Sequence, residues 1–239
     1  MSRSMLIQVP DGAFNGYLAL PAKTPAPGIV VLQEIFGVNQ VMRDTCDWLA
    51  SNGFAAFCPD LFWRIEPGID ITDSNDADLK RAFELFGLFD VDAGMADIAA
   101  SITALRAHHF CSGMVGTIGY CLGGKLAYLS ATRTDTDASV SYYGVAINEA
   151  LDEAKNITKP LLLHIAGQDE FVPPEAQKKV ISALDPNPLV TIYNYPDCHH
   201  AFARKGGAHY DAQASKLANA RSLAFLHTAL GSLMGGVQS

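Results

Sequence analysis

The sequence lacks the long apolar runs of membrane proteins and the basic excess of nucleic-acid-binding proteins. No window approaches the roughly 18 consecutive apolar residues that a membrane-spanning helix needs, and the first ten residues lack the apolar core of a signal peptide. Lysine and arginine number 17 against 25 acidic residues, which gives a formal charge of −8. This charge argues against nucleic acid or an anionic membrane as a partner, because both attract basic surfaces.

Cysteine is scarce, and repeats and linker-like segments are absent. The five cysteines are scattered and odd in number, which is not typical of a disulfide framework. We therefore interpret Cys46, Cys58, Cys111 and Cys198 as reduced structural residues and expect a cytoplasmic protein. Apolar residues make up 49% of the sequence, enough for a buried sheet, and we expect the 239 residues to form one α/β domain over 1–239.

Short apolar runs alternate with helical patterns along the chain. An antiparallel edge is expected from strands at 6–9 and 14–20. Further strands are expected at 28–33, 54–58, 114–118, 138–143, 160–165 and 189–193, and helices at 39–51, 76–89, 91–108, 122–132, 173–184 and 210–230. This alternation predicts a doubly wound, mostly parallel sheet with helices on both faces.

One stretch stands out, from Thr117 to Ala127, with the sequence Thr-Ile-Gly-Tyr-Cys-Leu-Gly-Gly-Lys-Leu-Ala. It joins an expected strand to a helix with apolar positions at Leu122 and Leu126. Cys121 lies at the corner between two glycines, where the central residue must adopt a strained backbone conformation. The arrangement resembles the nucleophile elbow of α/β-hydrolases, with cysteine in the usual place of serine.

Four polar side chains follow directly after expected strands: Glu34, Cys121, Asp169 and His200. In a parallel sheet the carboxyl ends of the strands meet at one edge, where functional groups gather. The chain order Cys…Asp…His is also the order in α/β-hydrolases. An imidazole can activate a thiol, and a carboxylate can orient the imidazole. The backbone N–H of Leu122, at a helix start, can donate to an oxyanion.

Each of these residues also has an interpretation without catalysis. Cys121 could be a small buried residue, Asp169 could cap the helix that begins near Pro173, and His200 could lie exposed in a loop. His199 is an alternative base. It is less plausible that all three non-catalytic interpretations hold together at strand ends than that these residues form a catalytic set. We therefore favour the catalytic set.

Two further histidine features have simpler interpretations. His164 comes from a strand interior, and we expect it to be a core histidine with its hydrogen bonds satisfied. The sequence Cys198-His199-His200 contains metal-ligating residue types, but a complete ligand set at a recognised spacing is missing. We therefore predict no metal site from the sequence.

Six short motifs, distributed over nearly the whole chain, resemble the dienelactone hydrolase family. They are Gln33-Glu34-Ile35-Phe36-Gly37-Val38-Asn39, Cys58-Pro59-Asp60-Leu61, the Gly119–Gly124 elbow, Tyr142-Tyr143-Gly144, the segment Gly167–Pro173, and His200-Ala201-Phe202-Ala203-Arg204. The resemblance implies the α/β-hydrolase fold and no cofactor. It also implies hydrolysis of an enol-lactone or another activated ester through a thioester intermediate.

The same resemblance implies residue roles. Cys121 is the nucleophile, Asp169 the orienting acid and His200 the base. The backbone N–H groups of Ile35 and Leu122 form the oxyanion hole. These expectations agree with the roles that the residue types and their order suggest.

Outside the triad, the resemblance gives Glu34 a contact with the resting thiol and Arg204 a role in holding a substrate carboxylate. Phe36 is expected to line the pocket. The expected ligand is a small lactone or ester, and the expected oligomeric state is a monomer or weak homodimer. A general carboxylesterase and a catalytically silent binding protein are the alternative functions.

The pocket departs from the family pattern. Members that act on dienelactone carry an arginine at the position of Leu79, a tyrosine at Phe83, a tryptophan at Phe86 and a serine at Ala201. We expect Phe83 to line the pocket. Lys80, next to Leu79, is rotated by about 100° around the helix but has a long side chain that can bend back toward it. The pocket is therefore predicted to be more apolar and to hold a carboxylate less firmly.

Overall fold

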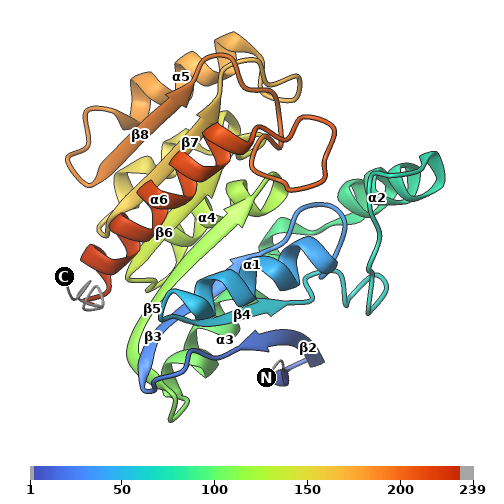
Figure 1. Ribbon diagram of the computed structural model, residues 1–239, viewed down its shortest axis with the longest axis vertical. Coiled ribbons are helices and arrows are strands. Elements are labelled where there is room, and N and C mark those ends of the chain that lie inside the picture. Colours follow the sequence, from blue (N-terminus) through green and yellow to red (C-terminus); the bar gives the residue numbers. More distant parts are fainter. Residues whose placement is uncertain (1–2, 232–239) are drawn as a thin grey trace.

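A sheet of eight strands, in the order β1-β2-β4-β3-β5-β6-β7-β8, forms the centre of the computed structural model, which describes residues 3–231 (Figure 1). β1 and β2 form an antiparallel edge, and β2 pairs antiparallel with β4. All other pairs are parallel. The strands are β1 (Arg3–Val9), β2 (Gly12–Ala19), β3 (Ala26–Leu32), β4 (Ala55–Pro59), β5 (Cys111–Tyr120), β6 (Ala138–Tyr142), β7 (Leu161–Ala166) and β8 (Val190–Tyr195).

Helices cover both faces of the sheet, as the sequence predicts. α1 and α6 lie in front of the sheet in Figure 1, and α3 and α4 pack against each other behind it. The strands β3, β4, β6 and β7 are therefore buried at every position, which explains the apolar runs of β3 and β4 and the mostly apolar sequence of β7. The helices are α1 (Gln40–Ser51), α2 (Asp76–Leu88), α3 (Val91–Ala107), α4 (Leu122–Arg133), α5 (Pro174–Leu184) and α6 (Ala212–Ala229).

Most expected elements agree with the structure to within a few residues, and polar caps account for part of the difference at the helix starts. Asn39, expected inside the first helix, instead caps it by accepting the N–H of Met42. Asn75 and Asp211 cap α2 and α6 in the same way. Two short 3-10 helices, η1 (147–149) and η2 (151–156), fall in a segment where the sequence predicts no element.

Two expectations from composition can be checked directly. All five cysteines are free and buried, in agreement with the interpretation of Cys46, Cys58, Cys111 and Cys198 as reduced structural residues. Within residues 3–231, no helix combines the length and the hydropathy that crossing a bilayer requires.

Candidate active site

Cys121 lies at a strained corner between β5 and α4. Its backbone dihedrals are φ 57° and ψ −114°, a conformation that L-residues rarely adopt. The glycines around it are required by close backbone packing. A Cβ atom on Gly119 would lie 1.9 Å from the carbonyl oxygen of Gly123, and one on Gly123 would lie 2.1 Å from the carbonyl oxygen of Leu32. The predicted elbow is therefore present, and the packing explains its glycines.

His200 and Asp169 form a buried pair at the same edge of the sheet. His200 Nδ1 donates a hydrogen bond of 2.8 Å to Asp169 Oδ2. The other carboxylate oxygen of Asp169 accepts the backbone N–H groups of Phe171 and Val172 at 2.9 and 3.1 Å. These bonds fix the carboxylate, so Asp169 orients the imidazole and does not cap α5, which has Pro173 at its N-cap.

Cys121 and His200 line the same cavity, and the sulfur lies near enough to the imidazole to raise its pKa. Because Nδ1 is engaged by Asp169, this leaves Nε2 for the sulfur. Burial alone would lower the pKa of His200, but the hydrogen bonds and negative charges of Asp169 and Cys121 raise it to about 10. A raised pKa makes the imidazole a stronger base, which suits it to take the proton from a neighbouring thiol.

The two other histidines considered from the sequence are placed elsewhere. His199 is half exposed, and its Nδ1 bonds to Glu170 at 2.7 Å instead of to Asp169. His164 is buried in the core, where its two ring nitrogens bond to Tyr195 and Ser222, both at 2.9 Å. The structure therefore brings His200, and neither of the other two, to the Cys121 corner.

Glu34 is buried at the end of β3 and pairs with Arg204. Arg204 Nη1 donates to Glu34 Oε2 at 3.3 Å, and its Nη2 donates to Asp73 Oδ2 at 2.8 Å. The guanidinium also lies over the ring of Phe36, 4.9 Å from its centroid. Glu34 thus bonds to an arginine and not to the thiol, because a carboxylate binds a guanidinium more strongly than a neutral thiol. Asp73 was not foreseen from the sequence.

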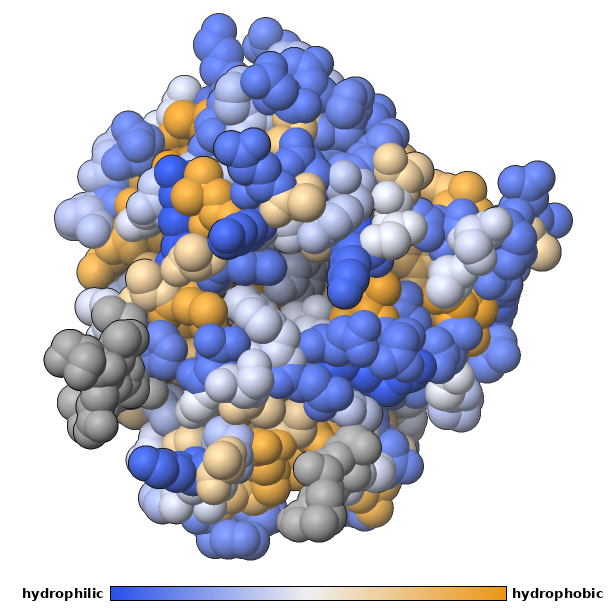
Figure 2. Space-filling view, in the orientation of Figure 1, coloured by the Kyte–Doolittle hydropathy of each residue, from blue (hydrophilic) through white to orange (hydrophobic). Residues whose placement is uncertain are grey.

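A cavity of about 330 Å³ opens over Cys121 and His200. α2 contributes Leu79 to the cavity wall. The exposed apolar side chains of α2 lie at the right of Figure 2. The polar part of the wall is formed by Glu34, Asp73, Arg204 and His209 together with His200, and Ala201 also lines it. The apolar lining includes Ile35, Phe36, Leu79, Phe83, Phe86 and Phe171.

Lys80 is not among the residues that line this cavity, so the bend toward Leu79 that its long side chain allows is not observed. Its side chain is exposed on α2, because a one-residue step from Leu79 turns it away from the site and its ammonium group keeps its hydration. Phe171 and His209 also line the cavity, and the sequence does not predict this because both lie in irregular loops without periodicity.

A second cavity, of about 430 Å³, lies between α1 and α6 on the opposite side of the Glu34–Arg204 pair. Figure 2 shows a hollow between these helices. Three buried atoms of its lining residues, Glu34 Oε1, Tyr143 OH and Arg204 Nε, have no hydrogen-bond partner within residues 3–231. Burial raises the pKa of Tyr143 well above its usual value, so its hydroxyl remains a donor. The pair thus separates two cavities.

Fold and site together define a class of enzyme. A mostly parallel sheet with a nucleophile-type residue at a strand–helix corner, and an acid and a histidine after later strands, is the α/β-hydrolase fold. A model described as the dienelactone hydrolase family matches residues 14–230, and the chain belongs to that family. It is accordingly a carboxylic ester hydrolase.

Individual relatives agree with this membership. A protein of Azospirillum brasilense is 50% identical over 223 residues, covering 92% of this chain and 96% of its own. The carboxymethylenebutenolidase of Pseudomonas putida is 40% identical over 227 residues, covering 95% and 96%. Among solved structures, a Klebsiella pneumoniae protein superposes with a TM-score of 0.81 at 26% identity, covering 94% of this chain and 98% of its own.

Proposed function

We propose that the protein hydrolyses an enol-lactone, or another ester with an activated leaving group, by covalent catalysis at Cys121. The observation that carries this proposal is the position of His200, which is bonded to Asp169 at 2.8 Å and lines the same cavity as Cys121 at the strained corner. This set supplies a nucleophile, a base and a group that orients the base.

The first half of the reaction forms a thioester. His200 takes the thiol proton, and the Cys121 sulfur attacks the carbonyl carbon. The resulting oxyanion accepts hydrogen bonds from the backbone N–H groups of Leu122 and Ile35. Leu122 begins α4, so its N–H has no acceptor within the helix. The carbon–oxygen bond then breaks, and the leaving oxygen receives the proton from His200.

The second half returns the enzyme to its starting state. His200 takes a proton from a water molecule, and the resulting hydroxide attacks the thioester carbon. The carbon–sulfur bond breaks, His200 returns its proton to the sulfur, and the product leaves as a carboxylic acid. When the substrate is a lactone, the leaving oxygen stays on the same molecule, so the ring opens to a single product. Asp169 stabilises the imidazolium in both halves.

The cysteine itself favours activated esters. In the tetrahedral intermediate, sulfur and the substrate oxygen compete to leave. A thiol ionises near pKa 8.5, far more readily than an alkyl alcohol, so an alkyl ester mostly reverts to starting material. An enol or phenol releases a stabilised oxyanion and lets the thioester form. This argument supports an enol-lactone or aryl ester over a simple alkyl ester.

The cavity limits which activated esters bind well. Relatives are named carboxymethylenebutenolidase, after a butenolide lactone. In this chain the one arginine of the cavity, Arg204, already pairs with Glu34 and Asp73, and the remaining wall is largely apolar. We therefore propose that substrates with an apolar body bind at least as well as carboxylate-bearing ones.

A leaving-group series tests the proposed function. Aryl, enol and alkyl esters of one acid should show kcat/KM rising steeply as the leaving group becomes more acidic. Cys121→Ser should flatten this dependence, because an alkoxide leaves less readily than a thiolate. Comparable wild-type rates on ethyl and nitrophenyl esters would contradict the proposal and favour a general carboxylesterase.

A further inference from the structure

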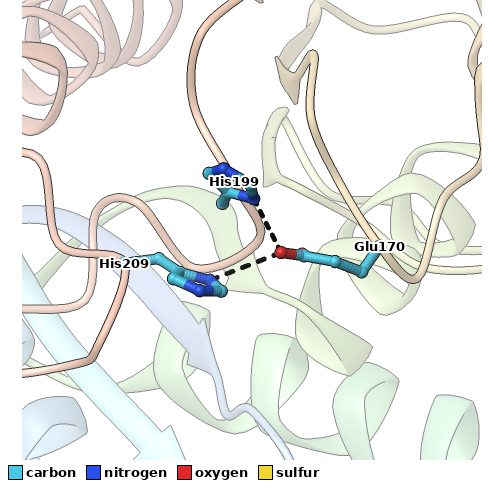
Figure 3. A group of neighbouring side chains, drawn as sticks. All are labelled: Glu170, His199 and His209. Carbon is cyan, nitrogen blue, oxygen red and sulfur yellow. Dashed lines mark hydrogen bonds and ion pairs between the residues drawn. The ribbon is translucent and has the colours of Figure 1, made fainter.

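Three side chains next to the catalytic residues converge on one point at the protein surface. Glu170 follows Asp169, and His199 precedes His200 in the chain. Figure 3 shows His199 and His209 approaching the carboxylate of Glu170 from different stretches of the chain. The Glu170 Oε1 atom lies 2.7 Å from His199 Nδ1 and 3.7 Å from His209 Nδ1.

The geometry of this cluster is close to that of a metal site. One ligand atom from each residue lies within 4.8 Å of the other two. In a tetrahedral zinc site, with metal–ligand distances near 2.1 Å, neighbouring ligand atoms are roughly 3.4 Å apart. The three side chains are between 43% and 50% exposed, so small side-chain rotations can close the remaining gap without moving the core.

We propose that Glu170, His199 and His209 form a binding site for one divalent transition-metal ion of the Zn²⁺ class. Two imidazole nitrogens and one carboxylate oxygen suit such ions, and water completes the tetrahedron. The ions that prefer oxygen ligands alone, Mg²⁺ and Ca²⁺, suit this set poorly.

The carboxylate is held in place for this role. The backbone N–H of His200 donates to Glu170 Oε2 at 3.3 Å, while Oε1 faces both histidines. One oxygen is thus anchored and the other is directed at the proposed ion. A simple surface ion pair needs only one histidine. Here both His199 and His209 approach the Glu170 carboxylate, and the centroids of their two rings are 4.8 Å apart.

The site joins the two loops that carry the acid and the base. Glu170 lies in the loop after β7, which also carries Asp169, and His199 lies in the loop after β8, which also carries His200. His209 comes from further along that second loop and also lines the catalytic cavity. A bound ion would hold the two loops together beside the cavity, so its occupancy should raise the melting temperature.

The sequence motif Cys198-His199-His200 could not predict this site, because the other two ligands are distant in the chain. Glu170 is 29 residues from His199 and belongs to a different loop. The histidine that follows His199 in the motif is turned inward to Asp169 and is not part of the cluster.

The experiment titrates ZnCl₂ into the full-length Cys121→Ser protein by calorimetry, after treatment with a chelator. This background removes the active-site thiol, which could bind zinc itself. We expect one ion per chain with a micromolar dissociation constant and a rise in melting temperature. Glu170→Gln and His209→Asn should each weaken binding at least tenfold. His109→Asn, an exposed histidine in the turn between α3 and β5, should change nothing.

Three results would overturn the proposal. The first is no stoichiometric binding at a zinc concentration 100-fold above the expected dissociation constant. The others are unchanged zinc binding in both Glu170→Gln and His209→Asn, or a weakening of zinc binding by His109→Asn that equals theirs. Circular dichroism of the chelated proteins verifies that each variant is folded. Because Glu170, His209 and His109 are exposed, their substitution in the Cys121→Ser background should not prevent folding. The site is independent of the proposed reaction, so its failure leaves the catalytic proposal standing.

Discussion

Removing one negative charge beside Arg204 should improve binding of carboxylate-bearing substrates. Arg204 donates to both Asp73, at 2.8 Å, and Glu34, at 3.3 Å, so its single positive charge faces two carboxylates. A substrate carboxylate that approaches Arg204 is therefore repelled by the second of them. Asp73→Asn keeps the shape of the side chain and an oxygen that can accept the hydrogen bond, while removing its charge.

The size of the effect follows from the geometry. Two unit charges about 4 Å apart interact by roughly 4 kcal/mol at an effective dielectric constant near 20. The side chain of Asp73 is 27% exposed, which screens this repulsion. We therefore expect about 1.4 kcal/mol, which corresponds to a tenfold lower KM. Asp73 belongs to the cavity wall and does not bond to the triad, so kcat should change little.

The assay compares a lactone that bears a carboxylate with its neutral amide. In Asp73→Asn, KM should fall about tenfold for the carboxylate and stay nearly constant for the amide. The control is Asp70→Asn, from the same surface segment, whose carboxylate pairs with Arg43 at 2.7 Å instead of with Arg204. An equal fall in KM for both substrates, a rise for the carboxylate, or the same result in Asp70→Asn would refute the reasoning.

Three more predictions concern the base, the elbow and the core. In chelator-treated protein, His200→Ala should lower kcat by about a thousandfold or more and His199→Ala far less; the reverse order in steady-state assays would show that the base is misassigned. Gly123→Ala should prevent folding, since its Cβ would lie 2.1 Å from a carbonyl oxygen; a native melting curve would contradict this. Burial and the charge of Arg221 lower the pKa of His164 to about 3, so the neutral form stabilises the fold above pH 6.5. That stability should be lost at about 1.4 kcal/mol per pH unit between pH 6.5 and about 3, and urea unfolding of His164→Gln should lack this loss.

The arrangement of the catalytic edge could be predicted because it depends on regular elements. Glu34, Cys121, Asp169 and His200 each follow an apolar strand, and parallel strands bring their carboxyl ends to one edge. The caps shifted helix boundaries by a residue without moving this edge. Family resemblance then narrowed the chemistry to activated esters.

The contacts that could not be predicted are made by irregular segments. Asp73 lies in a surface excursion without periodicity and reaches Arg204 across 131 residues of sequence. The same holds for Glu170 and His209, which meet only because two loops converge. Lys80 stays outside the cavity for another reason. Its ammonium group is stabilised more by hydration at the surface than it would be by bending into an apolar cavity.

Detection of an acyl group on Cys121 tests the central claim most directly. A nitrophenyl ester is mixed with the enzyme, quenched in acid within milliseconds and examined by intact-protein and peptide mass spectrometry. The account predicts a burst of nitrophenol of about one equivalent and an added acyl mass on the peptide that contains Cys121, both lost in Cys121→Ala. Turnover without any acyl mass on that peptide, or undiminished turnover in Cys121→Ala, would contradict it.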